Sequence, residues 1–175
     1  MQYTGHFTIT KKDNLDFNFL LMKKRLILSS ALVFVIIVAV VTLIRYQYYF
    51  MFVESLLQGL LMGVIGLVLM FGINVGSMYS RLNAMYKKRQ ITDFSFDVTV
   101  DESGFHAASE RGNSDIPWAR ILQAKETGRA FYIFITENNA NVLPKAQMQL
   151  PADADALRAI IKAYLEPGKC KLKKA

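Results

Sequence analysis

Residues 26–44 read LILSSALVFVIIVAVVTLI, and this stretch decides the architecture of the chain. It contains no charged residue, and its polar side chains are limited to Ser29, Ser30 and Thr42. A helix of this length spans about 28 Å, which is close to the hydrocarbon thickness of a bilayer. In lipid, only a helix satisfies every backbone polar group within one segment. Residues 26–44 therefore predict a transmembrane helix.

A second uncharged run covers residues 55–80 and predicts a second span over 56–80. Small residues let membrane helices approach each other closely. One interpretation is that the glycines seat this helix against Ala31, Ala39 and the serines of the first span. The alternative is a dimerisation or oligomerisation face, and we favour the first. The predicted helix-packing glycines are Gly59, Gly63, Gly66, Gly72 and Gly76.

Basic residues flank the two spans on the side away from the short, aromatic link at 45–55, which carries only Arg45 and Glu54. By the positive-inside rule, this asymmetry places both termini in the cytoplasm of a multi-pass membrane protein. Basic clusters that lie next to a membrane span on its cytoplasmic side are also attracted to anionic lipid headgroups. The residues predicted to contact headgroups are Lys23, Lys24, Arg25, Arg81, Lys87, Lys88 and Arg89.

The net charge of +7 over 175 residues lies mostly in these clusters and in the lysine-rich tail. Basic residues are not interleaved with stacking aromatics, so the composition argues against nucleic-acid binding. Cys170 is the only cysteine, which excludes an intrachain disulfide and a cysteine-rich metal site. We interpret it as an exposed reduced thiol, with lipidation as the less favoured alternative. No cofactor is predicted.

The N-terminal segment, residues 1–25, begins with strand-like alternation over 3–10 and continues with helical spacing up to the first span. Thr10 and Asp13 resemble a capping box at the start of that helix. An isolated strand is not stable, so we expect this strand to pair with the C-terminal domain.

The C-terminal domain, residues 91–175, follows a basic linker at 81–90 and is rich in strand patterns. Alternation predicts strands at 94–100, 105–109 and 118–126, with a turn at 111–115 before the third of these. Residues 130–136 are apolar on both faces and predict a central strand. Residues 142–150 alternate again, and Pro144 favours an edge position or a bulge.

The domain ends in an amphipathic helix that starts near Pro151 and stops at Pro167 and Gly168. Its apolar stripe comprises Leu157, Ile160, Ile161, Tyr164 and Leu165. The predicted fold class is an α+β membrane protein. It combines a two-helix transmembrane hairpin with a small antiparallel β-barrel or sandwich, pleckstrin-homology-like (PH-like) in outline and capped by the C-terminal helix.

Three motifs carry a resemblance to a known family. They are the segment FTITKKDNLDF at 7–17, the sequence IPWARI at 116–121 and the sequence VLPK at 142–145, arranged around the hairpin. The chain resembles the YcxB-like family of small bacterial membrane proteins, whose C-terminal domain is similar to bacterial PH-like domains. The resemblance implies this fold and a bacterial inner membrane, and it implies no activity.

No catalytic or metal-binding constellation is predicted. His6 and His106 are the only histidines, and neither lies near a carboxylate or cysteine pattern in the sequence. Ser29 and Ser30 lie in a span that carries no residue able to activate them. Trp118, the only tryptophan, is interpreted as a core anchor of the domain. Lys145 is interpreted as a solvated edge lysine, in preference to a cation that binds phosphate or an acidic peptide.

The favoured function is a non-enzymatic scaffold. In this hypothesis the PH-like domain binds a protein partner, or a second copy, at the surface of the lipid bilayer. One alternative is an anionic-lipid-sensing module. Another is an oligomeric channel or transporter component built on the glycine-rich hairpin.

Overall fold

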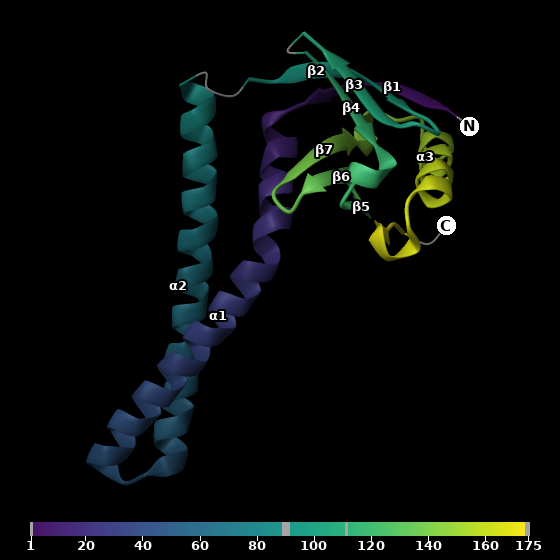
Figure 1. Ribbon diagram of the computed structural model, residues 1–175. Coiled ribbons are helices and arrows are strands. Elements are labelled where there is room, and N and C mark those ends of the chain that lie inside the picture. Colours follow the sequence, from purple (N-terminus) through teal and green to yellow (C-terminus); the bar gives the residue numbers. More distant parts are fainter. Residues whose placement is uncertain (1, 89–91, 111, 174–175) are drawn as a thin grey trace. The chain divides into compact units, whose positions relative to one another are not determined.

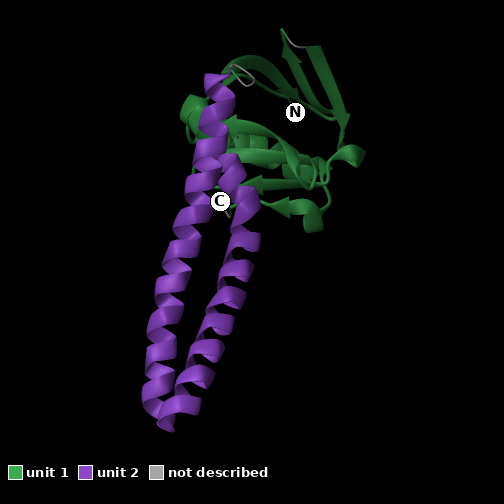
Figure 2. Cartoon of the chain, turned by 90° about the vertical axis from the view of Figure 1, so that its left-hand side faces the viewer, with its two compact units in different colours: residues 1–14, 92–175 green, residues 15–91 purple. Residues whose placement is uncertain are grey.

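The computed structural model describes residues 2–88, 92–110 and 112–173. The chain divides into two compact units, one comprising residues 1–14 with 92–175 and the other residues 15–91 (Figure 2). The first contains all of the described strands, and the second contains most of two long helices. This is an α+β architecture, as the sequence predicts.

Two helices make up the hairpin unit. Helix α1 (Lys11–Tyr49) starts in the first unit and continues into the second, where α2 (Phe52–Lys87) runs back antiparallel to it (Figure 1). At about 1.5 Å per residue each helix is longer than 50 Å, well beyond the roughly 30 Å of a bilayer core. Both helices are long and apolar enough to cross a membrane. These two helices indicate a membrane protein.

The start of α1 is fixed by the predicted capping box. The Thr10 backbone N–H donates to Asp13 Oδ2 at 2.9 Å, and the Asp13 N–H lies 3.4 Å from Thr10 Oγ1. These bonds satisfy backbone donors that the first helical turn leaves unpaired. The helix that follows is continuous, so the predicted juxtamembrane helix and the first span are one element. Likewise α2 extends to Lys87, and most of the predicted 81–90 linker is helical.

The strands form two four-stranded sheets (Figure 1). Sheet A has the order β1 (Tyr3–Ile9), β2 (Phe94–Val100), β3 (Gly104–Ser109) and β4 (Gly112–Pro117). Sheet B has the order β7 (Asn139–Pro144), β6 (Ala130–Thr136), β5 (Gln123–Glu126) and β8 (Cys170–Lys171). The sheets do not close on each other, so the domain is sandwich-like rather than a barrel.

The N-terminal strand pairs with the C-terminal domain, as expected. Each residue of β1 has a partner in β2, from Tyr3 opposite Val100 to Ile9 opposite Phe94. The whole hairpin is therefore inserted between two neighbouring strands of one sheet. Phe7 in β1 is completely buried, so this strand contributes directly to the core.

Helix α3 (Ala152–Tyr164) supplies the third layer of this core. Its buried residues follow the predicted helical spacing, and Leu157 and Ile161 are completely buried. Strand β6 lies between β7 and β5 and is buried over most of its length, as its doubly apolar sequence predicts. Pro144 ends β7, an edge strand of sheet B, in agreement with the predicted edge position.

Local predictions between 111 and 150 were wrong in three places. Residues 112–117, predicted to lie mostly in a turn, form β4, because pairing with β3 outweighs the low strand propensity of Gly-Asn-Ser-Asp. Residues 118–120 form a 3-10 turn, because Pro117 lacks the N–H needed to continue the ladder. The last predicted strand stops at Pro144, where a 3-10 turn (Lys145–Gln147) begins.

Candidate functional site

The outer face of sheet A gathers polar side chains from four strands. Register places His6 opposite Asp97, and His6 Nδ1 lies 2.7 Å from Asp97 Oδ1. Thr8 Oγ1 and Ser95 Oγ are 2.8 Å apart on the same face. The opposite face carries the buried residues of the same strands, including Phe7 and Val98. The alternation of the strands thus produces one apolar and one polar surface.

His106 is the centre of a second group on this face. Its Nδ1 lies 2.7 Å from Asp115 Oδ1, and its Nε2 lies 2.7 Å from Ser103 Oγ. Both histidines lie in strands, His6 in β1 and His106 in β3, and each meets a carboxylate that is distant from it in the sequence. The partners come from the paired strands and from the turn between β2 and β3, so only the strand register could have revealed them.

Ser103, His106 and Asp115 have the connectivity of a serine nucleophile, a base and an orienting acid. The contacts of Ser103 argue against that chemistry. Its hydroxyl donates to Asp101 Oδ1 at 2.6 Å, and the same oxygen accepts the Ser103 N–H at 2.8 Å. The Gly104 N–H also points to it, at 3.4 Å. The backbone donors that would hold an oxyanion are already bound to a carboxylate.

The electrostatics agree with a network that stabilises a turn. The hydrogen bonds from the Ser103 side chain and backbone lower the pKa of Asp101 below its ordinary value. The hydrogen bond to Asp115 raises the pKa of His106 above 6.5, because it favours the charged imidazolium, and it outweighs the opposing effect of burial. Gly104 completes the turn with φ of +152°, where an added Cβ would lie 2.2 Å from Ile116 O.

A hollow of about 650 Å³ lies on the same side of the domain, beside the turn between β3 and β4. Its charged and titratable lining residues are His6, Asp93, Asp97 and Glu110. Among the residues that the structure describes, no group of His, Cys, Asp and Glu side chains is arranged to hold a metal ion.

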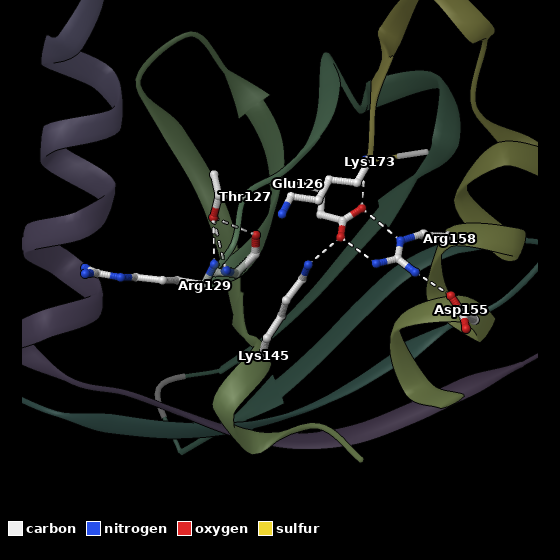
Figure 3. Close-up of polar contacts among 8 residues, drawn as sticks. Glu126, Thr127, Arg129, Lys145, Asp155, Arg158 and Lys173 are labelled. Carbon is white, nitrogen blue, oxygen red and sulfur yellow. Dashed lines mark hydrogen bonds and ion pairs between the residues drawn. The ribbon is translucent and has the colours of Figure 1, made fainter. Parts of the chain in front are cut away.

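A buried ionic cluster joins sheet B to α3 and the C-terminal tail (Figure 3). The Glu126 side chain is completely buried and accepts hydrogen bonds from Lys145 Nζ and from Arg158 Nε and Nη2. The Lys173 backbone N–H donates to its Oε2 at 2.9 Å. Arg158 also binds Asp155, one helical turn earlier. Four parts of the chain therefore meet at one carboxylate.

This cluster corrects the interpretation of Lys145. The side chain is buried rather than solvated, pairs with Glu126, and lies 4.7 Å from the centre of the Phe131 ring. Burial by itself would raise the pKa of Glu126, but the hydrogen bonds from Arg158 and Lys145 outweigh it and lower the pKa to about 2. Glu126 is therefore ionised at neutral pH, and its hydrogen bonds join β5 to α3 and the C-terminal tail.

Within the hairpin, three of the predicted glycines face α1. A Cβ at Gly59 would lie 2.4 Å from Thr42 Oγ1, and one at Gly63 would lie 2.7 Å from Val38 Cγ2. Gly66 meets Ile37 in the same way. Their neighbours are not Ala31 and Ala39, as the sequence suggested, because those alanines are exposed.

The other two glycines have a different environment. A Cβ at Gly72 or Gly76 would have no atom within 4 Å among the described residues. These two positions therefore do not contribute to the packing of α1 against α2.

The predicted headgroup contacts form two exposed groups. Residues 23–25 lie on α1, Arg81 and Lys87 lie on the last turns of α2, and Lys88 directly follows them. Arg89 lies outside the described residues. The exposed basic side chains are Lys23, Lys24, Arg25, Arg81, Lys87 and Lys88.

Trp118 is half-buried rather than part of the closed core. Its ring stacks on Tyr164 of α3 with a centroid distance of 5.8 Å, and its Nε1 donates to the Asp101 carbonyl at 2.9 Å. It thus links α3 to the end of β2. Cys170 is also half-buried, and burial raises the pKa of its thiol, which corrects the expectation of an exposed cysteine.

Comparison with known proteins identifies a family that part of the chain, residues 100–161, resembles. Residues 100–161 match the family model described as YcxB-like protein. This confirms the resemblance to the YcxB-like family for a segment that covers less than half of the chain. No curated protein and no solved structure matches the chain.

The YcxB-like segment runs from the end of β2 into α3. It contains the His106 network and the three side chains of the ionic cluster, Glu126, Lys145 and Arg158. It does not include β1, which completes sheet A from the other side of the hairpin.

Proposed function

We propose that this chain is a bacterial inner-membrane protein with two spans and cytoplasmic termini. Its sandwich-like domain would act as a non-enzymatic, PH-like interaction module at the membrane surface. The proposal rests on the family resemblance, the two apolar helices and the way in which the hairpin is inserted into the domain.

The insertion of the hairpin is the observation that carries the proposal. Ile9 and Phe94 are paired residues of β1 and β2, and the chain between them contains both apolar helices. Two paired residues must lie on one side of a bilayer, so a spanning hairpin returns the chain to the side from which it left. The exposed basic residues at that end of the helices favour the cytoplasmic side.

The arrangement of the domain supports the PH-like part of the proposal. Eight described strands form two four-stranded sheets that are antiparallel except for the β5–β8 pair, and one C-terminal amphipathic helix packs against their core. Modules of this kind present a rigid framework that holds a binding surface. We assign no catalytic role to Ser103, because the groups needed for oxyanion binding already bind Asp101.

Crosslinked affinity purification of the full-length protein from native membranes, read by mass spectrometry, tests the interaction role. We expect one stoichiometric protein partner. A matched, tagged variant that consists only of the hairpin, residues 15–91, and lacks the domain should not retain that partner. Recovery of lipid and self-crosslinks only, or of the same partner with the hairpin alone, would overturn the role of the domain.

Anionic-lipid sensing is a second candidate, favoured by the exposure of all six described basic residues of the predicted set. Each could contribute about 1 kcal/mol near an anionic surface. We expect detergent-purified protein to retain phosphatidylglycerol in native mass spectrometry. Replacing Lys23, Lys24 and Arg25 with Gln should reduce retention, whereas replacing Lys169 and Lys171 in the tail should not. Equal retention in both variants would count against this candidate.

A further inference from the structure

Strand β4 is an open edge of sheet A. It pairs only with β3, and five of its six residues are exposed, with Ile116 the buried one. The opposite edge of the sheet is closed: the Thr8 N–H donates to Gln147 Oε1 at 2.7 Å, and Gln147 Nε2 donates to the Thr8 carbonyl at 2.8 Å. Among the described residues, none provides an equivalent cover for β4.

The hydrogen-bond pattern shows which groups of β4 are open. The Asp101 N–H donates to the Gly104 carbonyl, so the backbone groups of Gly104 point toward β2. In an antiparallel sheet, the backbone groups of successive residues point alternately to the two neighbouring strands. Those of Phe105, Ala107 and Ser109 therefore point toward β4. Their partners are Ile116, Ser114 and Gly112. The backbone N–H and C=O groups of Asn113 and Asp115 consequently point away from the sheet. An edge with such groups is a template for another strand.

The charge of this region differs from that of the rest of the chain. Residues 92–117 contain six acidic residues and one basic residue, whereas residues 118–175 contain five acidic and ten basic residues. Asp115 is the acidic residue of β4 itself, and its side chain is 76% exposed beside His106. A strand added to β4 would place its own side chains next to Asn113 and Asp115.

This charge decides between occupants. A second copy that pairs through its own β4 would bring two segments of residues 92–117 together, each with six acidic residues and one basic residue, which is unfavourable. An anionic lipid surface would be repelled for the same reason. A strand rich in lysine or arginine would form hydrogen bonds with the open backbone groups of β4 and would also carry the opposite charge to that of residues 92–117. The β3–β4 hairpin extends beyond the rest of its unit (Figure 2).

We propose that β4 binds an extended, lysine- or arginine-rich segment of another protein, which adds a fifth strand to sheet A. This inference rests on the proposed role as an interaction module and names the chemistry of the partner.

The test uses full-length protein in nanodiscs of phosphatidylcholine, which has no net charge. The probe is a fluorescent peptide of alternating lysine and valine, and its control has glutamate in place of lysine. We expect the lysine peptide to bind, at least tenfold more tightly than the glutamate peptide, and to weaken as salt rises. Empty nanodiscs measure binding to lipid.

Two variants separate strand pairing from simple charge attraction. Asn113→Pro removes an outward N–H without removing a bond to β3, and proline is tolerated in edge strands. We expect it to abolish binding. Asp115→Asn should weaken binding several-fold, whereas Glu137→Gln, in the turn between β6 and β7, should leave it unchanged. Circular dichroism checks that each variant keeps its fold.

Equal binding of Asn113→Pro and wild type would overturn strand addition, and equal binding of both peptides would overturn the basic partner. Dimers that are lost in Asn113→Pro would show that a second copy is the occupant, which also rejects the proposal. If purification from membranes yields a partner that still binds the Asn113→Pro variant, the interaction role stands and only the assignment to β4 fails.

Discussion

Ile9 and Phe94 are paired across β1 and β2, and the whole membrane hairpin lies between them in the chain. The polypeptide thus completes one sheet from two segments that are separated by both apolar helices. Because β1 buries Tyr3, Phe7 and Ile9, the domain core depends on a strand that precedes the first span.

This pairing predicts that residues 92–175 do not fold by themselves. Burial of a large apolar side chain contributes about 1.5–3 kcal/mol, so the loss of three such residues approaches the total stability of a small domain. Replacing residues 10–93 with Asn-Gly should join the two strands by a tight turn and restore folding. Thermal unfolding followed by circular dichroism compares the two chains. Equal stability would contradict the role of β1.

Glu126→Gln should destabilise the domain strongly. The substitution leaves the buried Lys145 and the largely buried Arg158 without their carboxylate, and a broken buried pair costs about 3–5 kcal/mol. Urea unfolding of the Asn-Gly-joined domain measures the change. Glu166→Gln is the matched control, because the Glu166 side chain is 74% exposed in its pair with Lys169. This substitution should lower the free energy of unfolding by less than about 1 kcal/mol. Similar losses in both variants would argue against the cluster.

The same residue predicts a pH dependence. The pKa of Glu126 is about 2 in the folded domain, against an ordinary value of 4.5 that applies in the unfolded chain. The contribution of Glu126 to the free energy of unfolding is therefore complete above about pH 4.5. The contribution is lost as the pH falls from 4.5 toward 2, because the unfolded chain then binds the proton more tightly. Glu126→Gln should unfold with a weaker pH dependence in this window. An unchanged profile would show that other carboxylates dominate acid unfolding.

His106 should titrate above 6.5 because its charged form donates to Asp115. The stabilisation is therefore complete below pH 6.5 and is lost as the pH rises through the pKa of the folded state. Nuclear magnetic resonance of the imidazole protons measures this pKa directly. Asp115→Asn should lower it, while Glu137→Gln should leave it unchanged. A His106 pKa that is the same in Asp115→Asn would exclude the carboxylate as the cause.

The glycines of α2 should differ in their tolerance of larger side chains. Gly59→Leu should disrupt the hairpin, because even a Cβ would lie 2.9 Å from the Val38 carbonyl oxygen as well as against Thr42. Gly72→Leu should be tolerated, since a Cβ there meets no described atom within 4 Å. Unfolding of helical structure by sodium dodecyl sulfate compares the variants. A change of oligomeric state in Gly72→Leu alone would indicate that this face packs against another chain.

The sequence by itself determined the elements whose signals are local. Uncharged runs as long as a bilayer is thick can form only helices in lipid, so both long apolar helices were predictable from composition. Alternation identified β2, a run that is apolar on both faces identified β6, helical spacing identified α3, and the Thr10–Asp13 pair identified the start of α1. Each of these signals depends on neighbours within one element.

Only the tertiary structure decided the features that depend on distant partners. Strand β4 forms because β3 offers a ladder, although its own residues have low strand propensity. Lys145, in the turn after β7, is buried beside Glu126 of β5, which supplies the opposite charge. His6 and His106 find their carboxylates through strand register. The physical reason is the same in each case: the energy lies in a contact between residues that no sequence spacing brings together.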